Sequence, residues 1–170
     1  MATIVSKELI ADKVWRFRLE APRIARKRKA GQFVILRPTD ASERIPLTIA
    51  NASADAGWIE IIFQTVGKGT TMLAALPQGG EVHDLVGPLG QPTHIERFGR
   101  CLCIGGGVGI APLYPIVEAL EQAGNSITTI LGARDKSLLI LVEEMRRLSD
   151  TLVVATDNGS AGVQGFAADA

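Results

Sequence analysis

A glycine-rich segment, residues 105–112, limits the possible folds of this chain more than any other feature. It directly follows the apolar run 101–104 and opens a stretch, 112–123, whose pattern predicts a helix. A buried strand, a glycine turn and a helix in this order are typical of a βαβ unit in a parallel sheet. Glycines let the backbone approach a pyrophosphate closely, and a helix N-terminus offers unpaired N–H groups to an anion. We therefore expect the residues of this turn to bind a nucleotide: Gly105, Gly106, Gly107, Gly109, Ala111 and Pro112.

The spacing of these glycines departs from the strict G-x-G-x-x-G pattern, because Ile110 stands where the last glycine would be. A glycine-rich strand-to-helix turn without a ligand is therefore the alternative. Pro112 suits the first turn of a helix, where its missing N–H costs nothing. The strand, turn and helix context favours the nucleotide site.

The rest of the second half continues the alternation of strands and helices. The pattern predicts strands over 127–131 and 151–156, with a helix over 137–148 that Ser137 caps. The apolar run 101–104 is typical of a strand buried on both faces. We expect a parallel-sheet nucleotide-binding α/β domain over residues 99–170, incomplete because only one βαβαβ half is present.

The loop after the second of these strands bears on the choice of nucleotide. A fold that binds NAD usually has a carboxylate there, whereas a fold that binds NADP has cations for the 2′-phosphate. Arg134 and Lys136 flank the single acid Asp135. A guanidinium can hold a phosphate bidentately, so we expect NADP(H) in preference to NADH. The alternative is that both cations are solvent-exposed loop charges.

The first half, residues 1–98, has the shorter rhythm of antiparallel strands. Trp15, Phe17 and Leu19 alternate with charged residues, as in a half-buried strand. Further runs of this kind, separated by turn residues, predict a barrel of roughly six strands. One helix, residues 69–76, interrupts them. The expected architecture is therefore an antiparallel β barrel of about six strands (a six-stranded barrel) followed by the α/β domain.

Two segments of this barrel have the chemistry of a cofactor site. Arg44 could bind a pyrophosphate, while Thr48 and the backbone of Pro46 and Leu47 could hydrogen-bond a flat heterocycle. An edge strand with a surface arginine is the alternative. The start of the interrupting helix supplies N–H groups and hydroxyls suited to a phosphate. Its residues are Gly67, Lys68, Gly69, Thr70 and Thr71.

Together, these motifs resemble the ferredoxin–NADP reductase superfamily, in which a flavin-binding barrel precedes a nucleotide-binding domain. Residues 44–48 are similar to its Arg-x-Tyr/Pro-x-Ser/Thr flavin motif, and 67–71 to its flavin-pyrophosphate loop. Residues 87–90 are similar to the Gly-Pro-x-Gly that closes the barrel domain. Residues 105–112 resemble the pyridine-nucleotide loop. The resemblance spans the chain and implies FAD in the first domain and NADP(H), or NADH, in the second.

Within the superfamily, residues 21–25, 44–49 and 131–136 most resemble one branch, the small FAD subunit of NADH-dependent ferredoxin:NADP oxidoreductase, also called sulfide dehydrogenase β-type. A close relative is the electron-transfer subunit of dihydroorotate dehydrogenase. The resemblance implies a larger catalytic partner, a glutamate-synthase-like flavoprotein, and ferredoxin as a further partner. The segment around Asp157 resembles the family's nicotinamide-side segment.

The chain departs from this branch in its cysteines. A C-terminal cysteine cluster in the family binds a [2Fe-2S] centre, but no cysteine follows Cys103 here, so those ligands are absent and the chain reads as C-terminally truncated. We expect no metal site. The resemblance implies an FAD-dependent electron-transfer subunit that exchanges hydride with NADP(H) and passes electrons to an iron–sulfur centre or partner. The alternatives are an NAD-linked dihydroorotate dehydrogenase subunit and a non-catalytic flavin-binding module.

Composition excludes several other functions. Lys and Arg number 18 and Asp and Glu number 18, so no net basic field favours nucleic acid or an anionic membrane. The basic stretch 23–29 is typical of a solvated loop, although it could dock an acidic partner such as ferredoxin. No stretch approaches the roughly 20 apolar residues of a membrane span. Cys101 and Cys103 are too close for an ordinary disulfide, which favours a cytoplasmic protein.

Overall fold

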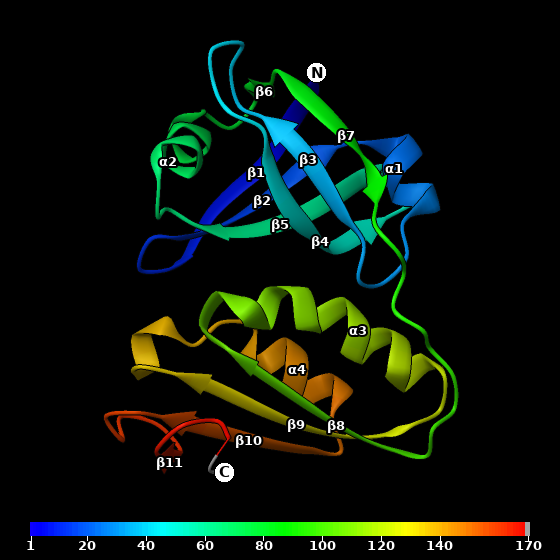
Figure 1. The fold of residues 1–170 in the computed structure, drawn as a ribbon, viewed down its shortest axis with the longest axis vertical. Helices are drawn as coiled ribbons and strands as arrows, with labels where there is room; N and C mark the ends of the chain where they lie inside the picture. The colour runs from blue at the N-terminus through cyan, green and yellow to red at the C-terminus, as the bar shows by residue number, and fades with distance from the viewer. Residues whose placement is uncertain (169–170) are drawn as a thin grey trace. The chain divides into compact units, whose positions relative to one another are not determined.

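The computed structural model describes residues 1–168 and divides into two compact units, Met1–Thr93 and the chain from His94 onward. Figure 1 shows an all-antiparallel sheet in the first unit and a parallel sheet with helices in the second. The predicted architecture, an antiparallel barrel followed by a partial α/β domain, is confirmed.

The first unit contains a seven-stranded sheet in the order β6-β1-β2-β5-β4-β3-β7. The edge strands β6 and β7 are separated only by His83, so the sheet curls until its two edges nearly meet. His83 divides this part of the chain into two strands, and the sheet has seven strands where roughly six were predicted. Its strands are β1 (Ala2–Ala11), β2 (Val14–Glu20), β3 (Phe33–Arg37), β4 (Ile45–Ser53), β5 (Trp58–Gln64), β6 (Glu81–Val82) and β7 (Asp84–Leu89).

The core of this unit lies inside the curled sheet. Phe17 and Leu19 are fully buried, as their alternation with charged residues predicts, while Trp15 is partly exposed under the ammonium group of Lys7. The rings of Phe17 and Phe63 meet edge to face with centroids 5.1 Å apart. Such pairs add to the stabilisation from apolar burial, so β2 and β5 are joined at the centre of the sheet.

Two helices lie in this unit, where the sequence pattern predicted one. The predicted helix 69–76 is α2, Lys68–Ala75, whose last carbonyls accept hydrogen bonds from the Lys7 ammonium. The additional helix is α1, Pro22–Lys27, in a region interpreted as a solvated loop. It begins at a proline and buries Ile24 and Ala25, so two apolar residues among several cations anchor it to the core.

The second unit contains a parallel sheet in the order β11-β10-β9-β8, with α3 and α4 on one face (Figure 1). Each helix follows one strand and leads into the next, as βαβ units require. Its elements are β8 (Arg100–Gly106), the 3-10 turn Gly107–Gly109, α3 (Ile110–Gln122), β9 (Ser126–Ala133), the 3-10 turn Lys136–Leu138, α4 (Val142–Leu148), β10 (Thr151–Thr156) and β11 (Val163–Gln164).

The predicted helix over 137–148 is wrong in its first part. A short turn, Lys136–Leu138, is followed by α4, which begins only at Val142. Ser137 is not its N-cap. Instead, the Asp135 carboxylate accepts the Ser137 N–H at 2.8 Å, and Leu141 has a φ of 55° that interrupts any continuous helix.

The prediction that residues 101–104 are buried on both faces is also wrong. Cys103 is 6% exposed, but Leu102 and Ile104 are 61% and 48% exposed. Neighbouring side chains on a strand point to opposite faces, and α3 packs on the face that Gly105 shares with Cys103, because a Cβ on Gly105 would lie 2.8 Å from Cδ2 of Leu113. Strand β8 also lies at the edge of the described sheet, so its other face has less cover than that of a central strand.

Within residues 1–168, no helix is long and apolar enough to cross a membrane.

Candidate functional site

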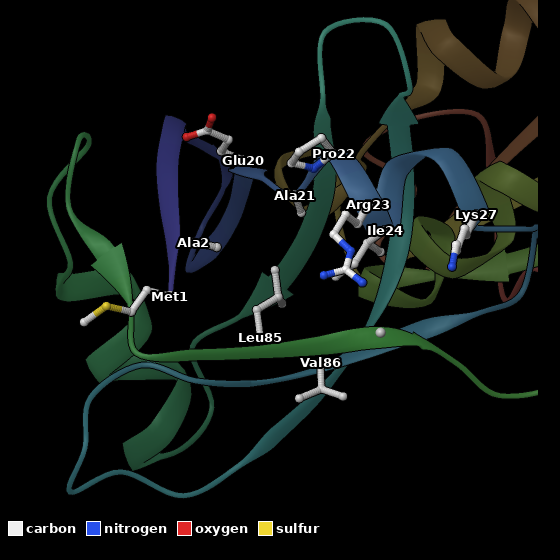
Figure 2. A pocket seen from close by; sticks show the side chains of 11 residues that line it. Met1, Ala2, Glu20, Ala21, Pro22, Arg23, Ile24, Lys27, Leu85 and Val86 are labelled. Carbon is white, nitrogen blue, oxygen red and sulfur yellow. The ribbon is translucent and has the colours of Figure 1, made fainter.

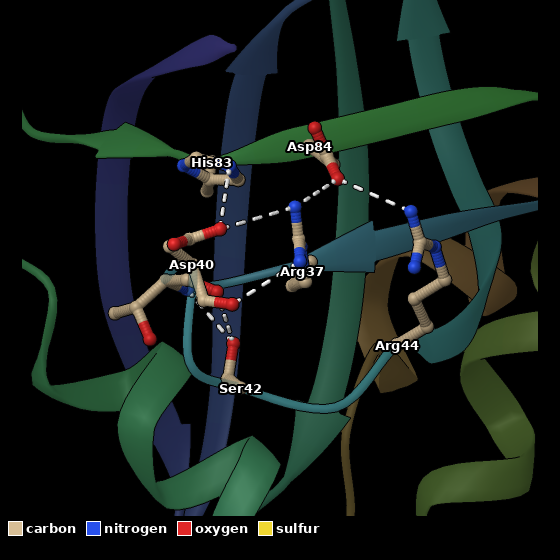
Figure 3. A network of polar contacts seen from close by, with 7 residues as sticks. Arg37, Asp40, Ser42, Arg44, His83 and Asp84 are labelled. Atoms are coloured by element: carbon tan, nitrogen blue, oxygen red, sulfur yellow. Dashed lines mark hydrogen bonds and ion pairs between the residues drawn. The ribbon is translucent and has the colours of Figure 1, made fainter.

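Arg44 lies immediately before β4, beside β3 and β7. Its side chain is 61% exposed, and its Nη2 lies 3.4 Å from Oδ2 of Asp84 (Figure 3). Arg37 contacts the same carboxylate more closely, at 2.8 Å. Arg44 is therefore oriented by one long contact and keeps most of its guanidinium open to a ligand.

The start of β4 presents an open edge next to Arg44. Residues Pro46, Leu47 and Thr48 pair with β3 on one side, whereas the register of β4 with β5 begins only at Ile49. Proline lacks a backbone N–H and is therefore confined to strand edges, so Pro46 fits at this position. On the side of β4 that faces β5, the backbone groups of residues 46–48 have no strand partner in this register. Such open backbone groups suit recognition of a flat heterocycle.

The N-terminus of α2 lies beside this edge. A Cβ placed on Gly69 would come within 2.9 Å of Cδ1 of Ile45, so helix and strand make close contact there. A Cβ on Gly67 would meet no atom within 4 Å, which leaves open space at the helix start. The structure thus brings the two predicted segments, 44–48 and 67–71, together.

The side chains of this helix start have different positions. The Thr70 hydroxyl lies 3.2 Å from the N–H of Gly67 and 3.1 Å from that of Val66, as a cap. Its hydroxyl is therefore already used, and it would serve a phosphate through its backbone N–H. Lys68 and Thr71 are exposed. The open space at Gly67, the helix N-terminus and the cation Arg44, one residue before Ile45, are features suited to a pyrophosphate.

The glycines of the turn in the second unit serve two purposes, close packing of α3 on β8 and open space at the start of α3. A Cβ on Gly105 would lie 2.8 Å from Leu113 Cδ2, so this glycine allows α3 to pack against β8. Gly107 has a φ of 53°, in the left-handed region that favours glycine. Cβ atoms on Gly107 and Gly109 would meet nothing within 4 Å. The turn therefore leaves an open cradle at the start of α3, where Ala111 is buried and Pro112 lies in the first turn.

The remaining predicted residues follow the carboxyl ends of the neighbouring strands. Arg134 and Lys136 follow β9, and Asp157 follows β10. The loops are tied together, because the N–H of Asp157 donates to the Ala133 carbonyl at 3.2 Å and the N–H of Lys136 donates to the Ser160 hydroxyl at 2.8 Å. Nucleotides bind at this edge of parallel sheets.

Asp135, the acid between the two cations, is hydrogen-bonded to the neighbouring Ser137. Hydrogen bonds from the side chain and backbone of Ser137 hold the pKa of the Asp135 carboxyl below its ordinary value, with help from Arg134. Arg134 and Lys136 are exposed. Lys136 also lines a cavity of about 510 Å³ together with Leu139 and Arg146. The cations are therefore the more available groups for an anionic ligand.

Another hollow, of about 500 Å³, lies on the first unit between α1 and β7 (Figure 2). Arg23 and Lys27 of the basic stretch line it, with Ile24 and Leu85 as apolar wall. The figure shows the guanidinium of Arg23 directed toward the hollow. None of the predicted cofactor residues lies in it.

The two cysteines are free thiols. Burial raises the pKa of the Cys103 thiol, with a smaller contribution from Cys101, so it stays protonated and packs as a small apolar residue.

Asp84 and Arg37 were missed by sequence reasoning. Nothing in the local sequence marks them, since an acid and a base separated by this distance in the chain are common. Only the register of β3 with β7, which places Arg37 opposite Asp84, reveals the pair. Recognition of β7 as the neighbour of β3 would have been the signal.

Comparisons with known proteins agree with this geometry. No family model matches the sequence. The chain is 47% identical over 167 residues to the dihydroorotate dehydrogenase B (NAD(+)), electron transfer subunit homolog of Thermotoga maritima, covering 98% of this chain and 59% of that protein. It is 33% identical over 173 residues to the dihydroorotate dehydrogenase B (NAD(+)), electron transfer subunit of Bacillus velezensis, covering 98% and 67%.

A solved structure is also similar. It is that of an NADH-dependent reduced ferredoxin–NADP oxidoreductase, described for flavin-based electron bifurcation, with a TM-score of 0.94 and 46% identity. The match covers 99% of this chain and 61% of that one. The chain thus spans between 59% and 67% of the length of these relatives.

Proposed function

The chain belongs to the family of dihydroorotate dehydrogenase B electron transfer subunits, with the ferredoxin–NADP reductase fold, and from this premise we propose that it is the FAD- and NADP(H)-binding part of an electron-transfer oxidoreductase. In this proposal residues 1–98 bind FAD and residues 99–170 bind the nicotinamide nucleotide. The observation that carries it is the meeting of Arg44, the open edge of β4 and the N-terminus of α2 in one place.

In the first unit, the proposed roles follow from the geometry. Arg44 and the N–H groups at the start of α2 bind the flavin pyrophosphate, where the absence of a Cβ on Gly67 leaves room. The backbone of residues 46–48 and the Thr48 hydroxyl hold the isoalloxazine ring. These groups bind and orient the cofactor, and no acid or base side chain is required of them.

In the second unit, the glycine turn holds the nucleotide pyrophosphate. The open positions Gly107 and Gly109 fit this group, because a Cβ at either would enter the cradle. Arg134 and Lys136 bind the 2′-phosphate of NADP(H), and Asp157 lies on the nicotinamide side. When bound, FAD supplies the chemistry, accepting hydride from the nicotinamide and releasing electrons to a further acceptor.

The further partners are part of the same proposal. We infer a larger catalytic subunit of the glutamate-synthase-like flavoprotein type, a [2Fe-2S] centre whose ligands are not among the residues of this chain, and ferredoxin as a further partner. The alternative, an NAD-linked electron-transfer subunit of dihydroorotate dehydrogenase, is supported by the names of the curated relatives. The two readings differ in nucleotide preference and can be separated on that ground.

An anaerobic absorption spectrum tests the proposal. The purified chain, reconstituted with FAD, is expected to show a protein-bound flavin band near about 450 nm that NADPH bleaches faster than NADH. Arg44→Ala should lower FAD retention while the circular dichroism spectrum stays that of the parent. A colourless protein that cannot be reconstituted would contradict the flavin site, and a flavin reduced by neither nucleotide would favour the non-catalytic module.

The nucleotide preference has its own variants. Replacing both Arg134 and Lys136 by alanine should weaken NADP⁺ binding by about 100-fold or more, since each of the two charge-assisted contacts contributes about 1.5–3 kcal/mol. NAD⁺ binding should change little, because it lacks the 2′-phosphate. Arg147→Ala, an exposed cation at the end of α4, is the matched control. Preferential binding of NAD⁺ by the parent would instead support the NAD-linked alternative.

A further inference from the structure

Arg44, Arg37 and Asp84 form one row across three strands of the first unit. Strand β3 lies between β4 and β7, with Leu36 opposite Ile45 on one side and Arg37 opposite Asp84 on the other. Arg44 directly precedes Ile45, so it comes next to Arg37 in the same row. Figure 3 shows the guanidinium groups of Arg37 and Arg44 converging on the Asp84 carboxylate.

The two arginines compete for a single oxygen. Asp84 Oδ2 lies 2.8 Å from Nη2 of Arg37 and 3.4 Å from Nη2 of Arg44. Arg37 is only 20% exposed and is fixed further by Asp40, whose carbonyl accepts from its Nη1 at 3.1 Å. Arg44 is 61% exposed. The less exposed Arg37 therefore holds the carboxylate, and the more exposed Arg44 makes only a long contact with it.

This arrangement sets how available Arg44 is to an anion. A carboxylate with no other cation beside it would close on Arg44 and form a direct salt bridge. An incoming phosphate would then have to break that bridge. With Arg37 in place, the carboxylate is already neutralised, while the long contact still directs the Arg44 side chain along the start of β4. Arg37 and Arg44 together carry one positive charge more than Asp84 balances, and the acid that also contacts Arg37, Asp40, is 85% exposed and makes no contact with Arg44.

We propose that Arg37 is a positioning residue, which keeps Asp84 from sequestering Arg44 and so holds Arg44 ready for the flavin pyrophosphate. The inference rests on the proposed FAD site. It adds that two residues outside the motif, on neighbouring strands β3 and β7, determine how strongly the motif arginine binds the cofactor.

The test is FAD affinity, measured by titrating the apo chain and following flavin fluorescence. Arg37→Gln should raise the dissociation constant about fivefold, which corresponds to the upper range of an exposed salt bridge, about 1 kcal/mol. Arg44→Ala should raise it more, by about 10-fold or more, because the phosphate contact itself is lost. The far-UV circular dichroism spectrum should remain that of the parent.

A double variant separates positioning from simple loss of charge. In Arg37→Gln/Asp84→Asn the carboxylate that would trap Arg44 is absent, so affinity should return to within about twofold of the parent. Arg37→Gln/Asp40→Asn has the same net charge, but Asp40 pairs with Arg37 and His83 rather than with Arg44. This variant should remain about as weak as Arg37→Gln alone.

Arg16→Gln is the matched control, because Arg16 pairs with Glu8 across two strands and is 22% exposed, close to the exposure of Arg37. Its FAD affinity should equal that of the parent. If Arg37→Gln does not fold, Arg37→Met keeps the buried stem and gives the same prediction.

Other outcomes overturn the inference. Parent-like affinity of Arg37→Gln would show that Arg44 is not trapped by Asp84. Equal recovery in the Asp84 and Asp40 double variants would show a general effect of charge, and recovery in neither would show a structural role for Arg37. In these cases the parent still binds FAD, so the proposed function stands. A parent that binds no FAD overturns both.

Discussion

Two glycines of the nucleotide turn should respond to the same substitution in opposite ways. Gly109 has a φ of −64° and a ψ of −12°, which are helical values, and a Cβ there would meet no atom within 4 Å. Gly107 also has open space, but its φ is 53°. Alanine therefore fits sterically at both positions, whereas its backbone preference matches only Gly109.

The magnitudes follow from these torsion angles. Gly109→Ala should stabilise the second unit by about 0.4–1 kcal/mol, because alanine has less freedom than glycine to lose on folding. Gly107→Ala should destabilise it by about 1–2 kcal/mol, the cost of the left-handed conformation. For a domain of this size, 1 kcal/mol shifts the melting temperature by about 4–8 °C. The two variants should thus move it in opposite directions.

Nucleotide binding should fall in both variants despite the opposite changes in stability. The added methyl group occupies the cradle and keeps the pyrophosphate from the N–H groups at the start of α3. Loss of one or two charge-assisted hydrogen bonds corresponds to about 10- to 100-fold in the dissociation constant. We would measure NADP⁺ binding by isothermal titration calorimetry and unfolding by differential scanning calorimetry on the same samples.

If Gly109→Ala binds NADP⁺ as tightly as the parent, the turn is not the pyrophosphate cradle. If Gly109→Ala melts at a lower temperature than the parent, the space beside Gly109 is not open. Gly124→Ala is the control, because its φ of 81° carries the same backbone strain as Gly107 at a site remote from the turn. It should lose stability but keep NADP⁺ affinity.

Two further predictions concern stability. Asn125→Ala should lower the free energy of unfolding of the second unit, measured by urea denaturation, by about 2–4 kcal/mol. The reason is that this buried amide accepts from the N–H groups of Phe98 and Gly99 and donates to two carbonyls. Replacing the exposed Asn158 by alanine should change that free energy little, and an equal loss in both variants would contradict the prediction. The Ile127 N–H and the Ser126 hydroxyl hold the pKa of the Asp150 carboxyl below its ordinary value, so its stabilising contribution is present near neutral pH and is lost as the pH falls below about 4. Asp150→Asn should therefore show a smaller fall in melting temperature between about pH 6 and pH 3 than the parent, and parallel curves would contradict this.

Some features of this protein were predicted because their requirements are local. The turn 105–112 needs glycine where a side chain would strike Leu113 or where φ is positive, and the sequence shows glycine at those places. The alternation of apolar and charged residues that predicted the antiparallel strands is also a local pattern. The predicted resemblance to the ferredoxin–NADP reductase superfamily is confirmed by the relatives and the solved structure. The roles of the individual site residues stay predictions.

Other features depend on neighbours that the sequence does not name. Whether Leu102 and Ile104 are buried is decided by which elements cover each face of β8, and not by the hydrophobicity of the strand itself. Helix α1 forms in a basic stretch because Ile24 finds a place in the core. Ser137 could have capped a helix, but the positive φ of Leu141 delays that helix by one turn.

The sequence by itself determined the two kinds of sheet, the nucleotide turn and the segments 44–48 and 67–71, because each is written within a few consecutive residues. The tertiary structure alone decided that these two segments meet, and that Arg37 and Asp84 stand beside Arg44. The physical reason is the register between strands, which depends on how the whole sheet closes. A contact between residues 37 and 84 therefore leaves no local pattern in the chain.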